Sequence, residues 1–290
     1  MNPIVEAALR SWRLAPGPAL ALSLTTVIYW RGWLKLDRRL RALFPPARLL
    51  SFLAGLAMIF IAIESPLDEL ADLFLTPHMI QHLLLLMVAP PLILYGNPFL
   101  PLLRGLPQAA LKEVVRPIIS WKPLKRIGRT VTNPVFCWTA YVASTVGWHV
   151  PAAFDAAWGW PTLHLIEHSC FLGTGLLFWW PVMLPWPARP QWPRLAMIPY
   201  LFLADIQNTA LSAYMIFCDR VLYSTYAGAI RLPGLSPLQD QITAGAIMWV
   251  PGSVVFLAPV ILISVRAVSG QRRAVRPSTL KAFRVEPSRV

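Results

Sequence analysis

Seven long apolar runs constrain this chain more than any other feature of its sequence. A helix that crosses a membrane needs about 20 mainly apolar residues. Backbone polar groups in lipid must be bonded internally, so each run is expected to be a helix. The runs cover residues 18–34, 49–67, 76–95, 133–150, 163–184, 195–217 and 238–265. The sequence therefore predicts an all-α fold, a polytopic membrane bundle of seven transmembrane helices.

The composition excludes several other classes of protein. Only 13% of the residues are charged and 56% are hydrophobic, whereas soluble domains carry about 25% charged residues. A soluble domain, a disordered chain and a coiled coil are therefore excluded. The net charge of +13 does not point to nucleic acid, because polytopic membrane proteins gather basic residues in the loops of one side. Three cysteines without CxxC spacing predict neither a disulfide framework nor a zinc ribbon.

The basic residues predict the orientation of the bundle. Of 26 Lys and Arg residues, the first loop holds six, the third loop seven and the C-terminal tail seven. Seven spans place these three segments on one side. The positive-inside rule then puts the C-terminus in the cytoplasm and the N-terminus outside. We predict an N-terminal interfacial segment at 1–17 that lacks the pattern of a cleavable signal, a transmembrane domain at 18–265 and a basic cytoplasmic tail at 266–290.

All five histidines fall at the predicted outer face. Two pairs repeat a nearly identical pentapeptide, HMIQH at residues 78–82 and HLIEH at residues 164–168, each in the first turns of a span. The fifth, His149, ends the fourth span. Histidines at i and i+4 share one helix face, and imidazole suits copper, zinc, iron and nickel. Because ionisable groups in membrane spans usually mark function, the two pairs predict a metal site.

Other interpretations of these histidines remain open at this stage. They can be interfacial polar residues, and HLIEH also matches the inverted zinc-protease pattern, although its twin has Gln81 where Glu167 stands. His82 and His168 on facing helices can hold a bis-histidine haem. Both pairs lie at helix N-termini, where the dipole disfavours a cation; nearby acids such as Asp240 can offset this. Met248 is either a soft Cu(I) ligand or core filler.

Four further motifs accompany the histidine pairs. The first pair leads into APPLILYGNP at residues 89–98, and His149 lies in WHVPAAF at residues 148–154. The second pair precedes GLLFWWP at residues 175–181, and DQITAGAIMW follows at residues 240–249. In this order the motifs resemble the CtaG-type cytochrome c oxidase assembly factor family over about residues 50–255. The resemblance implies a polytopic bacterial membrane protein that matures haem–copper oxidases by delivering copper.

Together, these observations predict a non-enzymatic assembly factor in the bacterial inner (plasma) membrane that binds a copper ion. The expected ligands are His78, His82, His164 and His168, with His149 as a fifth, Asp240 as acceptor of a histidine N–H and Met248 as a soft ligand. The expected partners are cytochrome c oxidase subunits and membrane lipids. The alternatives are a haem-binding electron-transfer protein and a metal permease, for which Asp205, Gln207 and Asn208 are the mid-span candidates.

Overall fold

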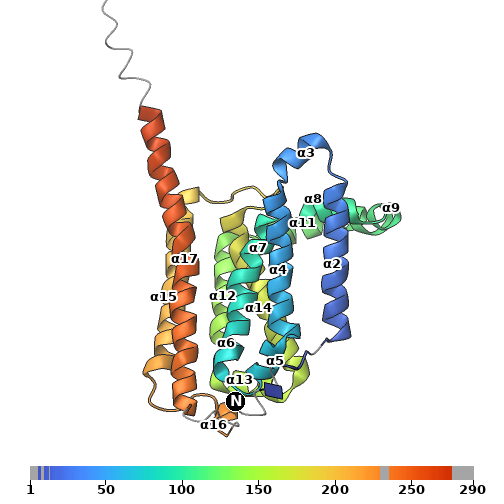
Figure 1. Cartoon of the computed structure of the whole chain (residues 1–290). Helices are drawn as coiled ribbons and strands as arrows, with labels where there is room; N and C mark the ends of the chain where they lie inside the picture. Colours follow the sequence, from blue (N-terminus) through green and yellow to red (C-terminus); the bar gives the residue numbers. More distant parts are fainter. Residues whose placement is uncertain (1–5, 8–9, 13, 229–234, 276–290) are drawn as a thin grey trace, which may run out of the picture.

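The computed structural model describes residues 6–7, 10–12, 14–228 and 235–275. Within these residues all regular secondary structure is helical, which confirms the predicted all-α class (Figure 1). Most of the predicted cytoplasmic tail, residues 276–290, and part of the predicted interfacial segment lie outside the described residues. The last helix continues to Val275, ten residues past the predicted end of the transmembrane domain.

The helices follow one another with short connections. They are α2 (Pro16–Leu34), α3 (Arg38–Leu43), α4 (Pro46–Glu64), α5 (Pro66–Ala71), α6 (Leu75–Leu83), α7 (Ala89–Tyr95), α8 (Phe99–Gly105), α9 (Gln108–Ala110), α10 (Arg116–Ser120), α11 (Lys122–Val131), α12 (Pro134–Trp148), α13 (Pro151–Gly159), α14 (Pro161–Met183), α15 (Met197–Phe217), α16 (Ser224–Ala227) and α17 (Pro237–Val275). Two π-helical turns, Leu84–Val88 and Leu111–Val115, and a 3-10 turn, Arg194–Ala196, complete the order.

Prolines explain where several of these helices begin and bend. Proline occupies one of the first two positions of α2, α4, α12, α13 and α14. An N–H at these positions has no partner within the helix, so proline, which lacks it, costs no hydrogen bond there. Pro90 and Pro91 act differently, because they follow the π-helical turn Leu84–Val88 inside one continuous helical segment. Neither can donate to the carbonyl four residues earlier, and the widened turn lies at the point where those bonds are lost.

Three helical segments are long and apolar enough to cross a membrane: Pro46–Glu64, Leu75–Tyr95 and Pro237–Ser269. They make this chain a membrane protein. The other predicted spans coincide with α2, α12, α14 and α15, which are less clear by the same measure. α12 has only 15 residues, fewer than the about 20 that a span needs. α14 and α15 carry polar side chains that lower their hydropathy, so the count of seven stays a prediction.

The elements at the two ends of the bundle differ in character. Figure 1 shows α3, α8, α9 and α11 at one end, where α17 also finishes, and α5, α13 and α16 at the other. The first loop, the third loop and the described start of the tail thus lie toward one end of the bundle, as we predict for basic segments on a common side. Within the bundle α17 packs along α15, and α2 packs against α8.

Glycines permit the close contact between α2 and α8. A Cβ atom on Gly32 would lie 1.7 Å from the Pro101 carbonyl oxygen, and one on Gly105 would lie 1.8 Å from the Ile28 carbonyl oxygen. No side chain fits at such distances, so the two backbones touch directly. α2 is held through this contact at the basic end.

Candidate metal centre

The structure brings the five histidines together at the end of the bundle opposite the basic segments. His78 and His82 come from α6, His164 and His168 from α14, and His149 follows the last turn of α12. The ring centroids of His78 and His82 are 4.3 Å apart, and those of His164 and His168 are 4.2 Å apart. The two pairs face each other, since the His78 ring lies 5.4 Å from His164 and the His82 ring 5.8 Å from His168.

His149 completes the cluster from a third helix. Its ring centroid lies 6.0 Å from that of His82. His78, His82, His149 and His168 are buried, and His164 is half-buried. The predicted histidine site is therefore assembled from helices that lie far apart in the sequence.

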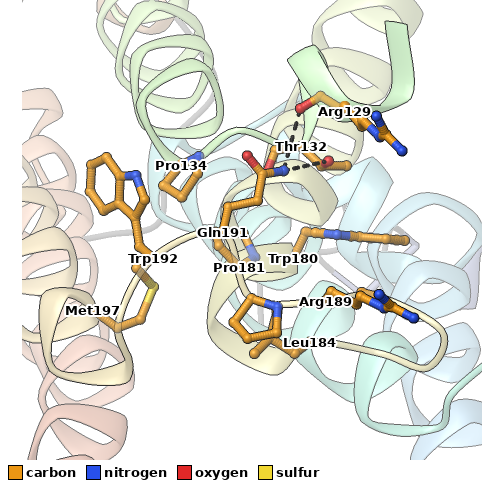
Figure 2. A pocket seen from close by; sticks show the side chains of 12 residues that line it. Arg129, Thr132, Pro134, Trp180, Pro181, Leu184, Arg189, Gln191, Trp192 and Met197 are labelled. Atoms are coloured by element: carbon orange, nitrogen blue, oxygen red, sulfur yellow. Dashed lines mark hydrogen bonds between the residues drawn. The ribbon is translucent and has the colours of Figure 1, made fainter. Parts of the chain in front are cut away.

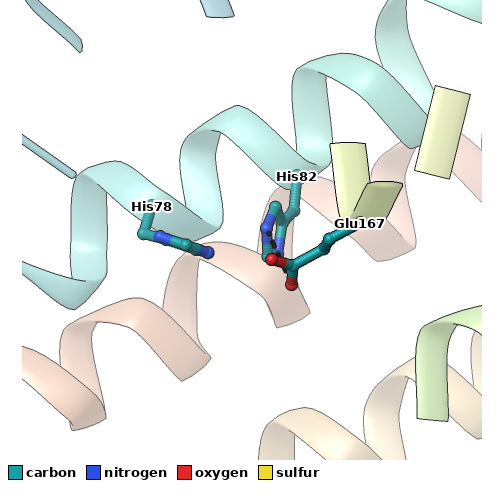
Figure 3. A group of neighbouring side chains, drawn as sticks. All are labelled: His78, His82 and Glu167. Carbon is teal, nitrogen blue, oxygen red and sulfur yellow. Dashed lines mark ion pairs between the residues drawn. The ribbon is translucent and has the colours of Figure 1, made fainter. Parts of the chain in front are cut away.

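A carboxylate that the sequence interpretation did not include among the ligands also belongs to this cluster. Glu167 is buried, and its Oε1 lies 3.5 Å from His82 Nε2. The side chains of His78, His82 and Glu167 offer ligand atoms within 4.8 Å of one another (Figure 3). The sequence contained an indication of this role for Glu167. It lies three residues after His164 and therefore shares a helix face with that histidine.

The corresponding residue of the first pentapeptide has a structural role. Gln81 Nε2 donates to the Ala62 carbonyl oxygen at 2.6 Å and to Asp68 Oδ1 at 2.9 Å. These bonds tie α6 to the end of α4 and to α5. The Gln/Glu difference between the two pentapeptides therefore separates an anchoring residue from a candidate ligand.

Hydrogen bonds assign the protonated nitrogen in two of the rings. His149 Nδ1 lies 2.7 Å from the Thr145 carbonyl oxygen. A carbonyl only accepts, so Nδ1 carries the hydrogen and Nε2 keeps its lone pair. The Tyr226 hydroxyl donates to the Ala71 carbonyl oxygen at 2.5 Å. Its oxygen, 3.2 Å from His78 Nδ1, therefore accepts from that nitrogen, which leaves the lone pair of His78 on Nε2.

These lone pairs have no partner within the described part of the chain. The buried imidazole nitrogens without a hydrogen bond are Nε2 of His78, His149, His164 and His168, and both ring nitrogens of His82, one of which carries the hydrogen in a neutral ring. A buried polar atom without a partner costs about 1–3 kcal/mol, so a group of converging acceptors favours an occupant. A cation can bind two neutral imidazoles, those of His78 and His82, and the Glu167 carboxylate at once, because their ligand atoms lie within 4.8 Å of one another. The residues present therefore fit a transition-metal ion.

Asp240 does not accept from a histidine. Its Oδ2 accepts from the Leu75 N–H at 2.7 Å and its Oδ1 from the Thr76 N–H at 3.1 Å. These N–H groups open α6, so Asp240 caps the helix that carries His78 and His82. Its negative charge also lies at the positive end of that helix dipole.

Met248 lies in an apolar cluster rather than among the imidazoles. It is buried with Leu75, Met79, Phe154, Met215, Tyr223, Tyr226 and Ala244. Two members of this cluster also touch the histidines, because Tyr226 bonds to His78 and the Phe154 ring lies 4.9 Å from the His78 ring. The cluster thus forms one wall of the centre.

The centre is covered at the end of the bundle and opens to the side. Tyr223 next to α16 donates to the His149 carbonyl oxygen at 3.3 Å. Asp155 of α13 holds α16 by accepting from Ser224 Oγ at 2.7 Å and from Thr225 Oγ1 at 2.8 Å. A cavity of about 360 Å³ reaches His164 and His168 from between the start of α2, α4 and α14. Asp68 and Ser169 also line it.

The chain is similar to several mycobacterial proteins. An uncharacterized protein of Mycobacterium bovis and one of Mycobacterium tuberculosis are each 26% identical over 94% of this chain and 41% of their own length. One of Mycobacterium leprae is 24% identical over 86% of this chain and 38% of its own length. The chain thus spans about two fifths of these relatives. No solved structure matches it. Residues 27–269 match the family model of the cytochrome c oxidase caa3 assembly factor, and the chain belongs to this family.

Proposed function

We propose that this protein is a non-enzymatic assembly factor that binds copper at the histidine cluster and delivers it to a haem–copper oxidase. The observation that carries the proposal is the set of buried imidazole nitrogens without a hydrogen bond in five neighbouring rings. Two of these rings, His78 and His82, and Glu167 offer ligand atoms within 4.8 Å of one another. Membership of the family indicates which protein would receive the copper, because the family is named for the assembly of cytochrome c oxidase. Copper is then the cargo of the site.

The donor set supports copper over other divalent ions. Imidazole nitrogens with one carboxylate bind several first-row metals, and among them the affinity of a given site is greatest for Cu²⁺. Calcium and magnesium prefer sites made of oxygen alone. A site of at most five imidazoles and Glu167 therefore selects against the two abundant hard cations.

A bis-histidine haem is less well supported. The His82 ring packs against His78 and against Phe171, each with a centroid separation of 4.3 Å. A haem held by His82 and His168 needs its flat macrocycle between the two axial rings. It would have to displace this packing, whereas a single ion would not.

The proposed topology places the centre outside the cytoplasm. Seven spans, with the N-terminus outside and the C-terminus in the cytoplasm, put the basic end of the bundle inside. The histidine end then faces the periplasm or cell exterior of a bacterial plasma membrane. Copper reaching the cluster from that side would not have to cross the membrane first.

Cysteine labelling from outside the cell tests this orientation. In a background without Cys137, Cys170 and Cys218, we expect Glu69→Cys to react with a membrane-impermeant thiol reagent and Lys122→Cys to react only after the membrane is opened. Position 69 lies in α5 near the centre, and position 122 begins α11 at the basic end. The reverse pattern would refute an outward-facing site.

Substitution of ligands tests the site. We expect His82→Ala and His168→Ala each to lower copper affinity tens-fold or more, because even losses outside the ligand set cost about 10–100-fold. Glu167→Gln should weaken binding as well, since it removes the carboxylate charge. Metal analysis and competition titration of the purified protein give the measurement. Cys170→Ala, two residues after His168 on α14, serves as the control and should bind like the wild type.

The contrary result is equally clear. Equal copper content in the wild type and in a His82→Ala/His168→Ala double variant would remove the proposed site. A Soret band in the optical spectrum of the same samples would indicate that the site binds haem and not copper.

The side cavity predicts how metal enters and leaves. Ser169→Trp would fill the opening next to His164 and His168 without removing a ligand. We expect slower loss of copper to an added chelator, with little change in the equilibrium affinity. Stopped-flow chelation measures both quantities. Val146→Trp on an exposed position of α12 is the size-matched control, and equal rates in the two variants would exclude this route.

Deletion in the host bacterium tests the function itself. We expect oxidase subunits to be synthesised while the purified oxidase lacks copper and activity. Excess external copper should restore part of the activity, because mass action can bypass a delivery protein. A fully copper-loaded and active oxidase from the deletion strain would refute the assembly role.

A further inference from the structure

A second candidate site lies at the basic end of the bundle, far from the histidines. Two cavities meet there at Arg129. One, of about 490 Å³, lies between the α11–α12 corner and the loop after α14, and its lining includes Arg129, Arg189, Gln191, Trp180 and Trp192 (Figure 2). The other, of about 570 Å³, is lined by Arg126, Arg129, Thr130, Asn133, Val135, Phe136 and Thr139.

A glutamine fixes the shape of the first cavity. Gln191 Nε2 lies 3.3 Å from the Arg129 carbonyl oxygen and 3.3 Å from that of Thr132. Its Oε1 accepts from Asn133 Nδ2 at 3.4 Å. These bonds hold the loop after α14 against the start of α12. In the view of Figure 2, Arg129 and Arg189 consequently lie on either side of Trp180.

The arginines of the two cavities are available to an anion. Arg126, Arg129 and Arg189 form no ion pair among the described residues. All three are exposed. By contrast, Arg104 at the same end of the bundle has an acidic partner, Asp37, at 3.6 Å. Guanidinium groups form bidentate hydrogen bonds with phosphate oxygens. A phosphate group is therefore a suitable ligand for these three unpaired arginines.

The second cavity adds an apolar surface to the charges. α12 begins at Pro134, directly after the arginine segment, and its Val135 and Phe136 are 57% and 43% exposed. Tryptophans such as Trp180 and Trp192 are typical of the boundary between lipid tails and water. An occupant with its anionic group at Arg129 would therefore lay its apolar part along Val135, Phe136 and Thr139. A phospholipid has this shape and charge.

We propose that Arg126, Arg129 and Arg189 form a binding site for the phosphate of an anionic phospholipid, with an acyl chain in the groove along α12. Basic pockets beside membrane helices recognise such head groups. The site is independent of the metal centre, because it uses other residues at the opposite end of the bundle. A bound lipid would bridge α11, α12 and the loop after α14.

Native mass spectrometry of the full chain in neutral detergent, titrated with phosphatidylglycerol or phosphatidylcholine, tests the proposal. We expect one phosphatidylglycerol to bind tightly and phosphatidylcholine to bind weakly. The variant Arg126→Gln/Arg129→Gln/Arg189→Gln should bind phosphatidylglycerol about a hundredfold more weakly, because it loses the strong charge-assisted hydrogen bonds that guanidinium groups make to phosphate oxygens. Thr139→Trp keeps every charge but fills the groove, and it should also weaken binding.

A charge-matched control separates a site from general attraction. Lys112→Gln/Arg116→Gln/Lys122→Gln removes three exposed charges from the same end of the bundle. None of the three lines either cavity, and exposed charges at a distance are screened by salt, so we expect this control to bind within about threefold of the wild type. An equal loss in this control would overturn the proposal, as would equal binding of phosphatidylcholine. Displacement of the lipid by inorganic phosphate at the same concentration would show that the site binds phosphate anions in general, and it would also overturn the proposal. Circular dichroism checks folding, and Thr139→Trp alone decides the question if the triple variant does not fold.

Discussion

The packing of five imidazoles against one another, four of them buried, is the constraint on which the rest of this structure depends. Buried polar atoms are costly when they have no partner, and here all five rings contain buried nitrogens without a hydrogen bond. Such an arrangement persists only if the helices that carry it are fixed by other contacts. The geometry of the histidine cluster therefore depends on the hydrogen bonds that fix these helices.

Those supports are polar bonds between distant parts of the chain. Asp240 caps α6 from the start of α17, at a separation of 165 residues from Leu75, and removing an N-cap typically costs about 0.5–2 kcal/mol. Gln81 ties the same helix to α4 and α5, and Asp155 holds α16 over the cluster. The bond from Asp240 replaces a contact with water that the buried N–H of Leu75 cannot make. The centre is thus held from three directions without any of these groups binding the ion.

The two ends of the bundle serve different chemistry. One end concentrates neutral nitrogen ligands under a cover of tyrosines, and the other concentrates arginines and tryptophans around two cavities. The proposed copper site at the first end and the proposed phospholipid site at the second therefore use separate sets of residues. The separation also follows from membrane physics, since cytoplasmic loops collect basic residues.

The sequence by itself determined the helical class, the positions of the long helices and the set of histidines, because apolar runs and i, i+4 spacing are local properties of a chain. The matching depth of the two pentapeptides was enough to predict that His78, His82, His164 and His168 meet. Only the tertiary structure decided which neighbours join them. Glu167 enters the cluster whereas Gln81 turns to α4 and α5, Asp240 caps a helix, and Met248 packs in an apolar wall. Such roles depend on how helices are rotated against other segments, which lie between 13 residues away, for Gln81 and Asp68, and 165 residues away, for Leu75 and Asp240. No local pattern encodes that rotation.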